Sequence, residues 1–164
     1  MRLKADRWKV DAIRREGAER LASTTPELEG PLTLVSLDPP DLKRIFDAAC
    51  EEIHYAGACH RVGRLARLAI VGDGQWLGGV VLGSPFPNIR PRDDAFGLTP
   101  LVTDWSQRGL ISPWASENRQ YWDRLQLIVN HARTFVFPDF QGGSVGIKAH
   151  RLLLTVGRSI WEDR

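Results

Sequence analysis

A glycine-rich segment near the C-terminus has the residue types of an anion-binding loop. It reads Gln-Gly-Gly-Ser-Val-Gly over residues 141–146, between a β-type run and a helical pattern. A helix start presents unpaired N–H groups with partial positive charge, and glycines before it let a ligand approach the backbone. This pattern predicts a phosphate site, although the glycines could instead serve only to make a tight turn. The residues predicted to hold a phosphate-bearing cofactor are Gly142, Gly143, Ser144, Val145, Gly146 and Ile147.

His54 and Tyr55 are candidate catalytic residues at the end of a predicted helix. An imidazole beside a phenol could act as a general acid or base, or the two rings could stack on a nucleobase. The alternative is that His54 only contacts the last carbonyl groups of the helix.

Two further polar pairs are candidates for substrate binding and catalysis. Asp93 could be a catalytic carboxylate beside Arg92, which would position the substrate, or the two could form an exposed ion pair of little energetic weight. Asn130 and Arg133 flank the start of a β-type run, where they could bind bases or phosphates, or satisfy nearby backbone groups. We predict that Arg133 captures a phosphate together with the amides of residues 142–147.

The cysteines and histidines do not form a pattern typical of a metal site. Cys50, His54, Cys59 and His60 contain no C-x-x-C or H-x-x-x-H pair, and adjacent ligands at 59 and 60 suit tetrahedral zinc poorly. We therefore predict no bound metal. The chain also lacks a Gly-x-Ser-x-Gly nucleophile elbow, which disfavours a hydrolase of that class.

The elements that would position these residues alternate between helix and strand. A tight turn at residues 72–74 joins two largely apolar runs that predict a β-hairpin covered on both faces. Residues 84–116 contain many prolines and predict a long irregular stretch. The predicted helices span residues 4–22, 40–54 and 147–160, and the predicted strands span residues 32–37, 64–71, 75–83 and 133–137.

Length and composition indicate one globular domain in a reducing compartment. The chain has 164 residues, of which 43% are hydrophobic and 26% are charged, as in ordinary globular proteins. Its two cysteines are too few for a disulfide framework, and no apolar stretch resembles a signal peptide or membrane span. We expect a soluble cytoplasmic protein. The net charge of +2 permits DNA as a partner without requiring it.

The order strand, helix, hairpin, strand, glycine loop, helix resembles the GNAT acetyltransferase superfamily. In that superfamily an R/Q-x-x-G-x-G/A loop holds the pyrophosphate of coenzyme A. Gln141 matches the first position, but Ser144 stands where glycine is expected and Gly146 comes one place late. The resemblance implies a three-layer α/β fold with a mixed sheet and flanking helices, and acyl-coenzyme A as the cofactor.

Five short motifs, in order, resemble the DruA family of the Druantia anti-phage system. His54 begins an H-Y-x-G motif, residues 74–78 resemble g-x-W-L-G, and Arg92 begins a motif similar to R-D-x-x-I-G-W. Residues 127–135 resemble V-V-N-N-S-R-F, and residues 161–164 resemble W-x-x-R. The resemblance implies a defence or mobile-element protein that acts on or near DNA.

Together the two resemblances predict group transfer to a nucleobase, with His54, Tyr55, Asp93 and Arg133 on the substrate side. We expect a helix and linker at residues 1–31 and the α/β domain at residues 32–164. Family members continue beyond the position of Arg164, so the sheet would be incomplete at its C-terminal edge, where a second chain could supply a strand. The alternative is a non-catalytic module that binds nucleic acid or protein through a degenerate cofactor loop.

Overall fold

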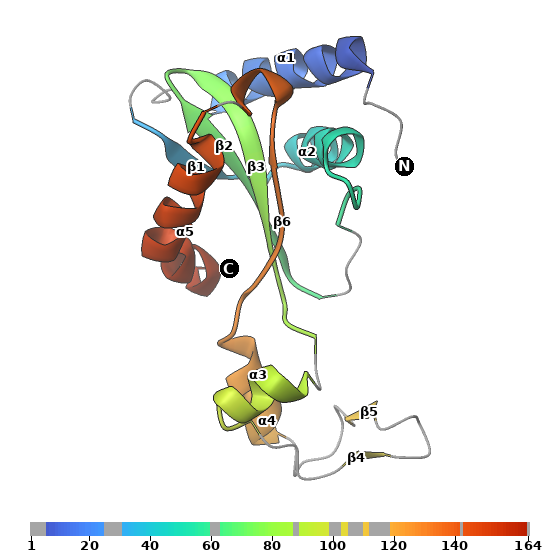
Figure 1. The fold of residues 1–164 in the computed structure, drawn as a ribbon, viewed down its shortest axis with the longest axis vertical. Helices are drawn as coiled ribbons and strands as arrows, with labels where there is room; N and C mark the ends of the chain where they lie inside the picture. The colour runs from blue at the N-terminus through green and yellow to red at the C-terminus, as the bar shows by residue number, and fades with distance from the viewer. Residues whose placement is uncertain are drawn as a thin grey trace. The chain divides into compact units, whose positions relative to one another are not determined.

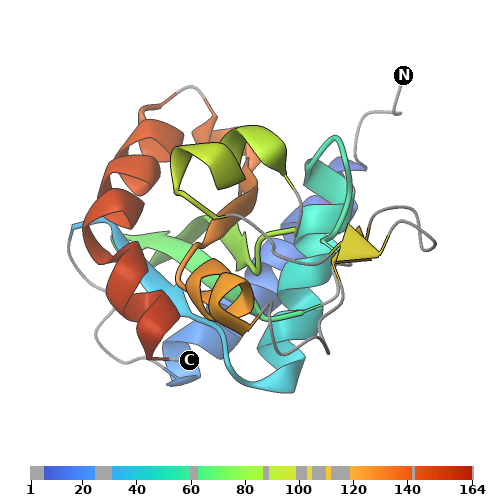
Figure 2. The same cartoon turned by 90° about the horizontal axis from the view of Figure 1, so that it is seen from below.

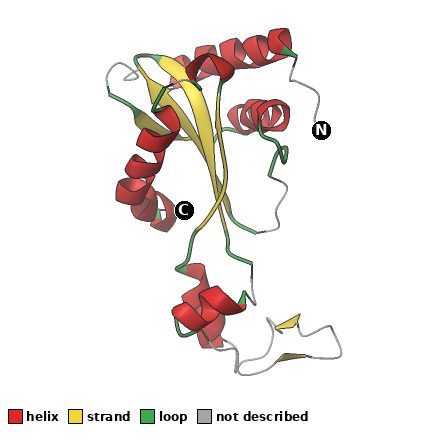
Figure 3. Ribbon diagram, in the orientation of Figure 1, coloured by secondary structure: helices red, strands yellow, loops and turns green. Residues whose placement is uncertain are grey.

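The structure is a computed structural model in which the chain forms two compact units. It describes residues 6–24, 31–59, 63–86, 89–98, 103–104, 110–111, 119–141 and 143–163. The first unit combines residues 1–83 with residues 131–164, and the second comprises residues 84–130. Figure 1 labels the elements and Figure 3 distinguishes helices from strands. The helices and strands of the first unit are α1 (Arg7–Thr24), β1 (Thr33–Ser36), α2 (Pro40–Ile53), β2 (Leu65–Gly72), β3 (Gln75–Gly83), β6 (Asn130–Val136) and α5 (Val145–Glu162).

The first unit is built on a four-stranded sheet in the order β1-β2-β3-β6. Strand β2 pairs antiparallel with both β1 and β3. The Phe137 N–H donates to the Leu77 carbonyl, and β6 returns along β3 in the opposite direction (Figure 1). The described strands therefore form an antiparallel sheet, whereas the sequence predicted a mixed one.

The predicted hairpin is confirmed, with β2 and β3 joined at Asp73 and Gly74. Both turn residues have positive φ angles, of 49° and 70°. An Asp-Gly pair is a favoured solution for a two-residue turn whose twist matches the flanking strands. Every residue from Leu68 to Gly72 in β2 is buried, because helices cover both faces of the sheet.

Helices α1 and α2 cover one face of the sheet and α5 covers the other (Figure 1, Figure 2). Helix α2 begins with Pro40. Proline has no backbone N–H, which is harmless in the first turn because the N–H groups there have no partner within the helix. The helix buries its apolar stripe from Leu42 to Cys50. Helix α1 contributes Val10 and Leu21 to the same core. None of the described helices is long and apolar enough to cross a membrane.

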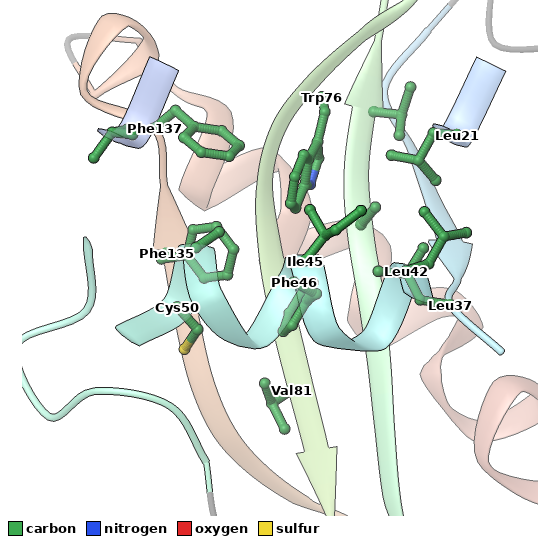
Figure 4. Packing of buried hydrophobic residues seen from close by; sticks show 14 of the residues in the cluster. Leu21, Leu37, Leu42, Ile45, Phe46, Cys50, Trp76, Val81, Phe135 and Phe137 are labelled. Atoms are coloured by element: carbon green, nitrogen blue, oxygen red, sulfur yellow. The ribbon is translucent and has the colours of Figure 1, made fainter. Parts of the chain in front are cut away.

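Four aromatic rings dominate the core between the sheet and the first two helices (Figure 4). The ring centroids of Phe46 and Phe135 lie 5.2 Å apart, and those of Trp76 and Phe137 lie 4.9 Å apart. Both pairs meet edge to face, an arrangement that aromatic rings prefer. The indole N–H of Trp76 donates to the Gly78 carbonyl at 2.6 Å, which satisfies the buried polar atom of that ring.

The described residues of the second unit form two helices and a short strand pair. Leu98, Tyr121 and Leu125 form its buried cluster. Its first helix lies inside the stretch that the sequence predicted to be irregular, and Pro91 occupies its first turn. Its elements are α3 (Arg90–Ala95), β4 (Thr103–Asp104), β5 (Leu110–Ile111) and α4 (Arg119–Gln126).

Candidate functional site

A pocket of about 450 Å³ lies beside strand β6, at the edge of the sheet in the first unit. The end of α2, the 3₁₀ turn Pro138–Phe140 and the start of α5 form its other walls. Five of the residues predicted for catalysis or cofactor binding meet here. The described residues that line the pocket are Ile53, His54, Tyr55, Thr134, Phe135, Val136, Phe140, Gln141, Gly143, Gly146 and Ile147.

Backbone hydrogen bonds fix the end of α2 at this pocket. The His54 N–H donates to the Cys50 carbonyl at 2.9 Å, and the Gly57 N–H donates to the His54 carbonyl at 2.8 Å. Gly57 has a φ of 68°, a conformation that favours glycine, and the next N–H, of Ala58, donates to the Glu51 carboxylate at 2.7 Å. The H-Y-A-G motif is therefore a turn that ends the helix and is held by these hydrogen bonds.

The hydrogen bonding of His54 determines what its ring can do. Its Nδ1 accepts the backbone N–H of Ala56 at 3.1 Å, so the neutral ring carries its proton on Nε2. In this state the ring is a hydrogen-bond donor at Nε2. This geometry suits a group that polarises a ligand oxygen better than it suits a general base.

Tyr55 lies at the mouth of the pocket and stacks on His54. The two ring centroids are 4.5 Å apart and the ring planes differ by 29°. The Tyr55 side chain is nevertheless 85% exposed. One face of its ring is therefore supported by the imidazole while most of its surface is open to solvent.

Among the described residues, neither a capping hydrogen bond from Ser144 nor an acidic residue in the first turn offsets the charge at the start of α5. Ser144 is the residue before the first helical turn, and its hydroxyl makes no capping hydrogen bond. The first turn also contains no acidic residue. The partial positive charge of the helix end is therefore available to an anion. Val145 begins this turn and Ser144 precedes it, but neither is among the residues that line the pocket, and Gly142 lies outside the described residues.

Neither Gly143 nor Gly146 is required by the fold. Their φ angles are not in the left-handed region. A Cβ added to Gly143 would lie 3.6 Å from the Phe140 carbonyl oxygen, and one added to Gly146 would lie 3.8 Å from a methyl carbon of Val136. Both distances are ordinary contacts. A tight turn therefore does not explain these two glycines.

The outer edge of β6 is partly covered by side chains of the chain itself. Because the Phe137 N–H points to β3, alternation along the strand turns the backbone groups of Thr134 outward. On one side, the Gln141 amide donates to the Val136 carbonyl at 3.0 Å. On the other side, Arg133 donates to the Ala132 carbonyl at 2.8 Å. The peptide groups of Thr134 lie between these two covered positions.

Arg133 and Asn130 do not line the pocket. Both are half-buried, and Asn130 belongs to the second unit by its contacts. The Nε of Arg133 is buried without a hydrogen-bond partner among the described residues. Their predicted roles in substrate binding remain predictions.

The two cysteines are buried free thiols. Burial raises the pKa of Cys50 to about 11, against the opposing charge of Arg133. The thiol is therefore protonated at neutral pH and is a poor nucleophile. No group of three or more metal-binding side chains occurs among the described residues, which do not include His60.

Arg92 and Asp93 lie in the second unit and make structural contacts there. Asp93 is only 4% exposed, and its carboxylate accepts hydrogen bonds from Arg92 Nε at 2.8 Å and from the Tyr121 hydroxyl at 3.2 Å. Arg92 also donates to the Phe86 carbonyl at 2.6 Å. Asp93 thus connects α3 to α4, and its predicted catalytic role has no support from these contacts.

An exposed histidine pair that bonds two residues of the pocket lining was not predicted from the sequence. The His131 and His150 rings lie 4.7 Å apart and are nearly perpendicular. His131 Nε2 bonds the Thr134 hydroxyl, and His150 Nδ1 bonds the Gly146 carbonyl at 2.9 Å. The pKa of His131 is lowered by desolvation and by the neighbouring His150. Only the fold brings these residues together, because they lie on β6 and α5.

The described lining of the pocket contains no carboxylate. Its ionisable side chains are His54 and Tyr55, and its backbone contribution comes from a strand edge and a helix start. The pocket therefore combines a surface that tolerates negative charge with an edge that can pair with an amide.

No protein-family model matches this chain, and comparisons with the curated proteins and with the solved structures likewise find no match.

Proposed function

We propose that the pocket binds an acyl carrier of the coenzyme A type and that the chain uses it for group transfer. The observation that carries this proposal is that Gly143 and Gly146 line the pocket although neither the backbone nor the packing requires glycine there. Glycine inside a helix lowers stability by up to about 1 kcal/mol relative to alanine. A ligand that needs the space beside α5 would account for Gly146.

The order of elements supports a GNAT-like reading of the first unit. Strand β1, helix α2, the β2–β3 hairpin, strand β6, the glycine loop and helix α5 follow one another as in that superfamily. The DruA-like motifs add an acceptor on or near DNA to this proposal. The acceptor would then be a nucleobase.

The residues present fit such a carrier. The amides at the start of α5 would hold phosphate groups, because Ser144 makes no capping hydrogen bond and the first turn of this helix contains no acidic residue. The outward peptide groups of Thr134 would pair with an amide of the carrier. His54 would donate from Nε2 to a ligand oxygen. When bound, the carrier would supply an acyl group activated as a thioester.

A strand from a second chain would use the same edge of the sheet. Gln141 and Arg133 already occupy the two carbonyl groups that flank Thr134. Side chains that cover an edge in this way protect it against strand addition. We therefore favour a small ligand with one or two amides over an added strand.

Thermal unfolding of residues 1–164 with and without millimolar acetyl-coenzyme A tests the proposal. A ligand present at 100 times its dissociation constant stabilises the folded state by about 2.7 kcal/mol, which raises the Tm of a domain of this size by roughly 5–10 °C. Gly143→Val and Gly146→Leu should abolish the shift. Ala48→Leu, at an exposed position of α2 away from the pocket, should keep it.

A cooperative melt that no carrier shifts would overturn the acyl-carrier proposal. Under that result, salt-sensitive binding to DNA without any carrier would favour the non-catalytic module instead. A shift that persists in both glycine variants would place the ligand elsewhere in the chain and would also contradict the proposal.

A further inference from the structure

We propose that Tyr55, supported by His54, is a stacking platform for a nucleobase at the mouth of the pocket. This inference deepens the proposed function and rests on the same pocket. The nucleobase has two sources under that function, the adenine of the carrier or a base of a nucleic-acid acceptor. Both present the same flat aromatic face to the tyrosine ring.

The first argument is the exposure of the ring. Single exposed aromatic side chains are common, but Tyr55 combines 85% exposure with a place in the lining of a pocket. Its ring rests on His54 with centroids 4.5 Å apart, so a second flat ring can stack on its other side. A stack of three rings would bury the aromatic surface that the unliganded protein exposes.

The second argument is that the platform is fixed before any ligand binds. The His54 ring is held through Nδ1 by the Ala56 N–H at 3.1 Å. The turn that carries both rings is held by the positive φ of Gly57 and by the Glu51 carboxylate on the Ala58 N–H. A side chain that is already ordered loses little conformational freedom on binding, so more of the stacking energy appears as affinity.

The third argument is the charge and size of the pocket behind the platform. A nucleobase reaches the protein attached to phosphate, and the described lining of this pocket contains no carboxylate to repel it. The uncapped start of α5 attracts an anion. The volume of about 450 Å³ lies within the usual range of ligand pockets, about 300–1,000 Å³.

Isothermal titration with two pairs of probes tests the platform and separates the two sources. The first pair is coenzyme A and 4′-phosphopantetheine, which lacks the adenosine. The second pair is a short single-stranded oligodeoxyadenosine and an abasic oligonucleotide of the same length. Each probe is titrated into the whole chain and into three variants, Tyr55→Ser, Tyr55→Phe and Trp8→Ser.

Stacking of a base on an aromatic side chain typically contributes enough that its removal weakens binding about 5- to 150-fold. We expect Tyr55→Ser to show this loss for coenzyme A or for the oligodeoxyadenosine, whichever supplies the base. The affinity for the matching probe without a base should be the same in Tyr55→Ser as in the wild type. Tyr55→Phe keeps the ring and should bind as the wild type does. Trp8→Ser, which removes a 67% exposed aromatic side chain from α1, should change nothing.

The results also separate this inference from the proposed function. If Tyr55→Ser binds every base-containing probe as tightly as the wild type, the platform is refuted, while binding of 4′-phosphopantetheine still supports the acyl carrier. If only the oligodeoxyadenosine binds and its binding depends on Tyr55, the platform stands and the acyl carrier fails. If no probe binds, both are refuted.

Discussion

Two groups of glycines in the first unit show two different reasons for the same residue type. In the core, a Cβ on Gly17 would lie 2.1 Å from a ring carbon of Trp76, and a Cβ on Gly79 would lie 2.2 Å from a ring carbon of Phe46. At the pocket, the corresponding contacts of Gly143 and Gly146 are ordinary, at 3.6 and 3.8 Å. The fold therefore excludes a side chain from the core positions and accepts one at the pocket. A ligand is what would exclude it there.

The largest effect that we expect from this comparison is at Gly79. A methyl group at this position would overlap the rings of Phe46 and Phe135, which lie 2.2 and 2.7 Å from the added carbon. Overpacking of this kind typically destabilises a core by about 1–3 kcal/mol. We expect Gly79→Ala to lower the free energy of unfolding by that amount in urea denaturation. Gly143→Ala is the matched control and should leave the urea midpoint almost unchanged. Equal losses of stability in both variants would show that the fold does not treat the core glycines and the pocket glycines differently.

Local signals in the sequence were sufficient for the hairpin and for part of the site. The Asp73-Gly74 pair and the apolar runs around it predicted the turn and both strands. This was possible because a hairpin forms between segments that are close in the sequence. The end of α2 and the glycine loop were each recognisable, and the structure brings both to one pocket. Two motifs that carried the family resemblance have structural roles. Trp76 packs in the core, and the turn after His54 ends a helix.

Other features depend on contacts that no local pattern encodes. The prolines of residues 84–116 indicated an irregular stretch, but Pro91 lies in the first turn of α3, where a missing N–H is harmless. Strand β6 begins at Asn130, three residues before the predicted strand, because pairing with β3 overrides the weak β propensity of its first residues. The meeting of His131 and His150 requires β6 and α5 to be in place.

The next largest effect is at Gly146, where stability and binding should change in opposite directions. Alanine is a better helix former than glycine by up to about 1 kcal/mol, and its Cβ meets only Val136 at 3.8 Å. We expect Gly146→Ala to raise the free energy of unfolding and to weaken binding of coenzyme A. Thr155→Ala, at an exposed position further along α5, should raise stability without affecting the ligand. Unchanged affinity in Gly146→Ala would show that the pocket does not need this space.

A smaller effect is expected from a charge at the start of α5. An aspartate at position 144 would interact favourably with the helix end by about 0.3–1 kcal/mol. Its carboxylate would also repel a phosphate at the same place. Ser144→Asp should therefore melt at a higher temperature, but its affinity for coenzyme A should fall and should recover partly at high salt. Ser144→Asn offers a cap without charge, so a loss of affinity in both variants would exclude repulsion as the cause.

The smallest expected effect is a pH dependence that originates at the pocket and not in the aromatic core. Desolvation, followed by the charge of His150, lowers the pKa of His131 below its usual 6.5 in the folded state. As the pH falls through 6.5, His131 becomes protonated in the unfolded chain before it does in the folded one. The stability contributed by a neutral His131 is therefore lost progressively, until the pH reaches the lower pKa of the folded state. The protection of the Lys148 amide against hydrogen exchange, corrected for the intrinsic pH dependence of exchange, should therefore fall on acidification from about pH 8 to pH 5, because this N–H donates to the Ser144 carbonyl in the turn whose Gly146 carbonyl His150 bonds. His131→Gln, which cannot titrate, should flatten this dependence while exchange in β2 and β3 stays the same. An identical pH profile in this variant would assign the effect to another group and leave the histidine pair without a role at the pocket wall.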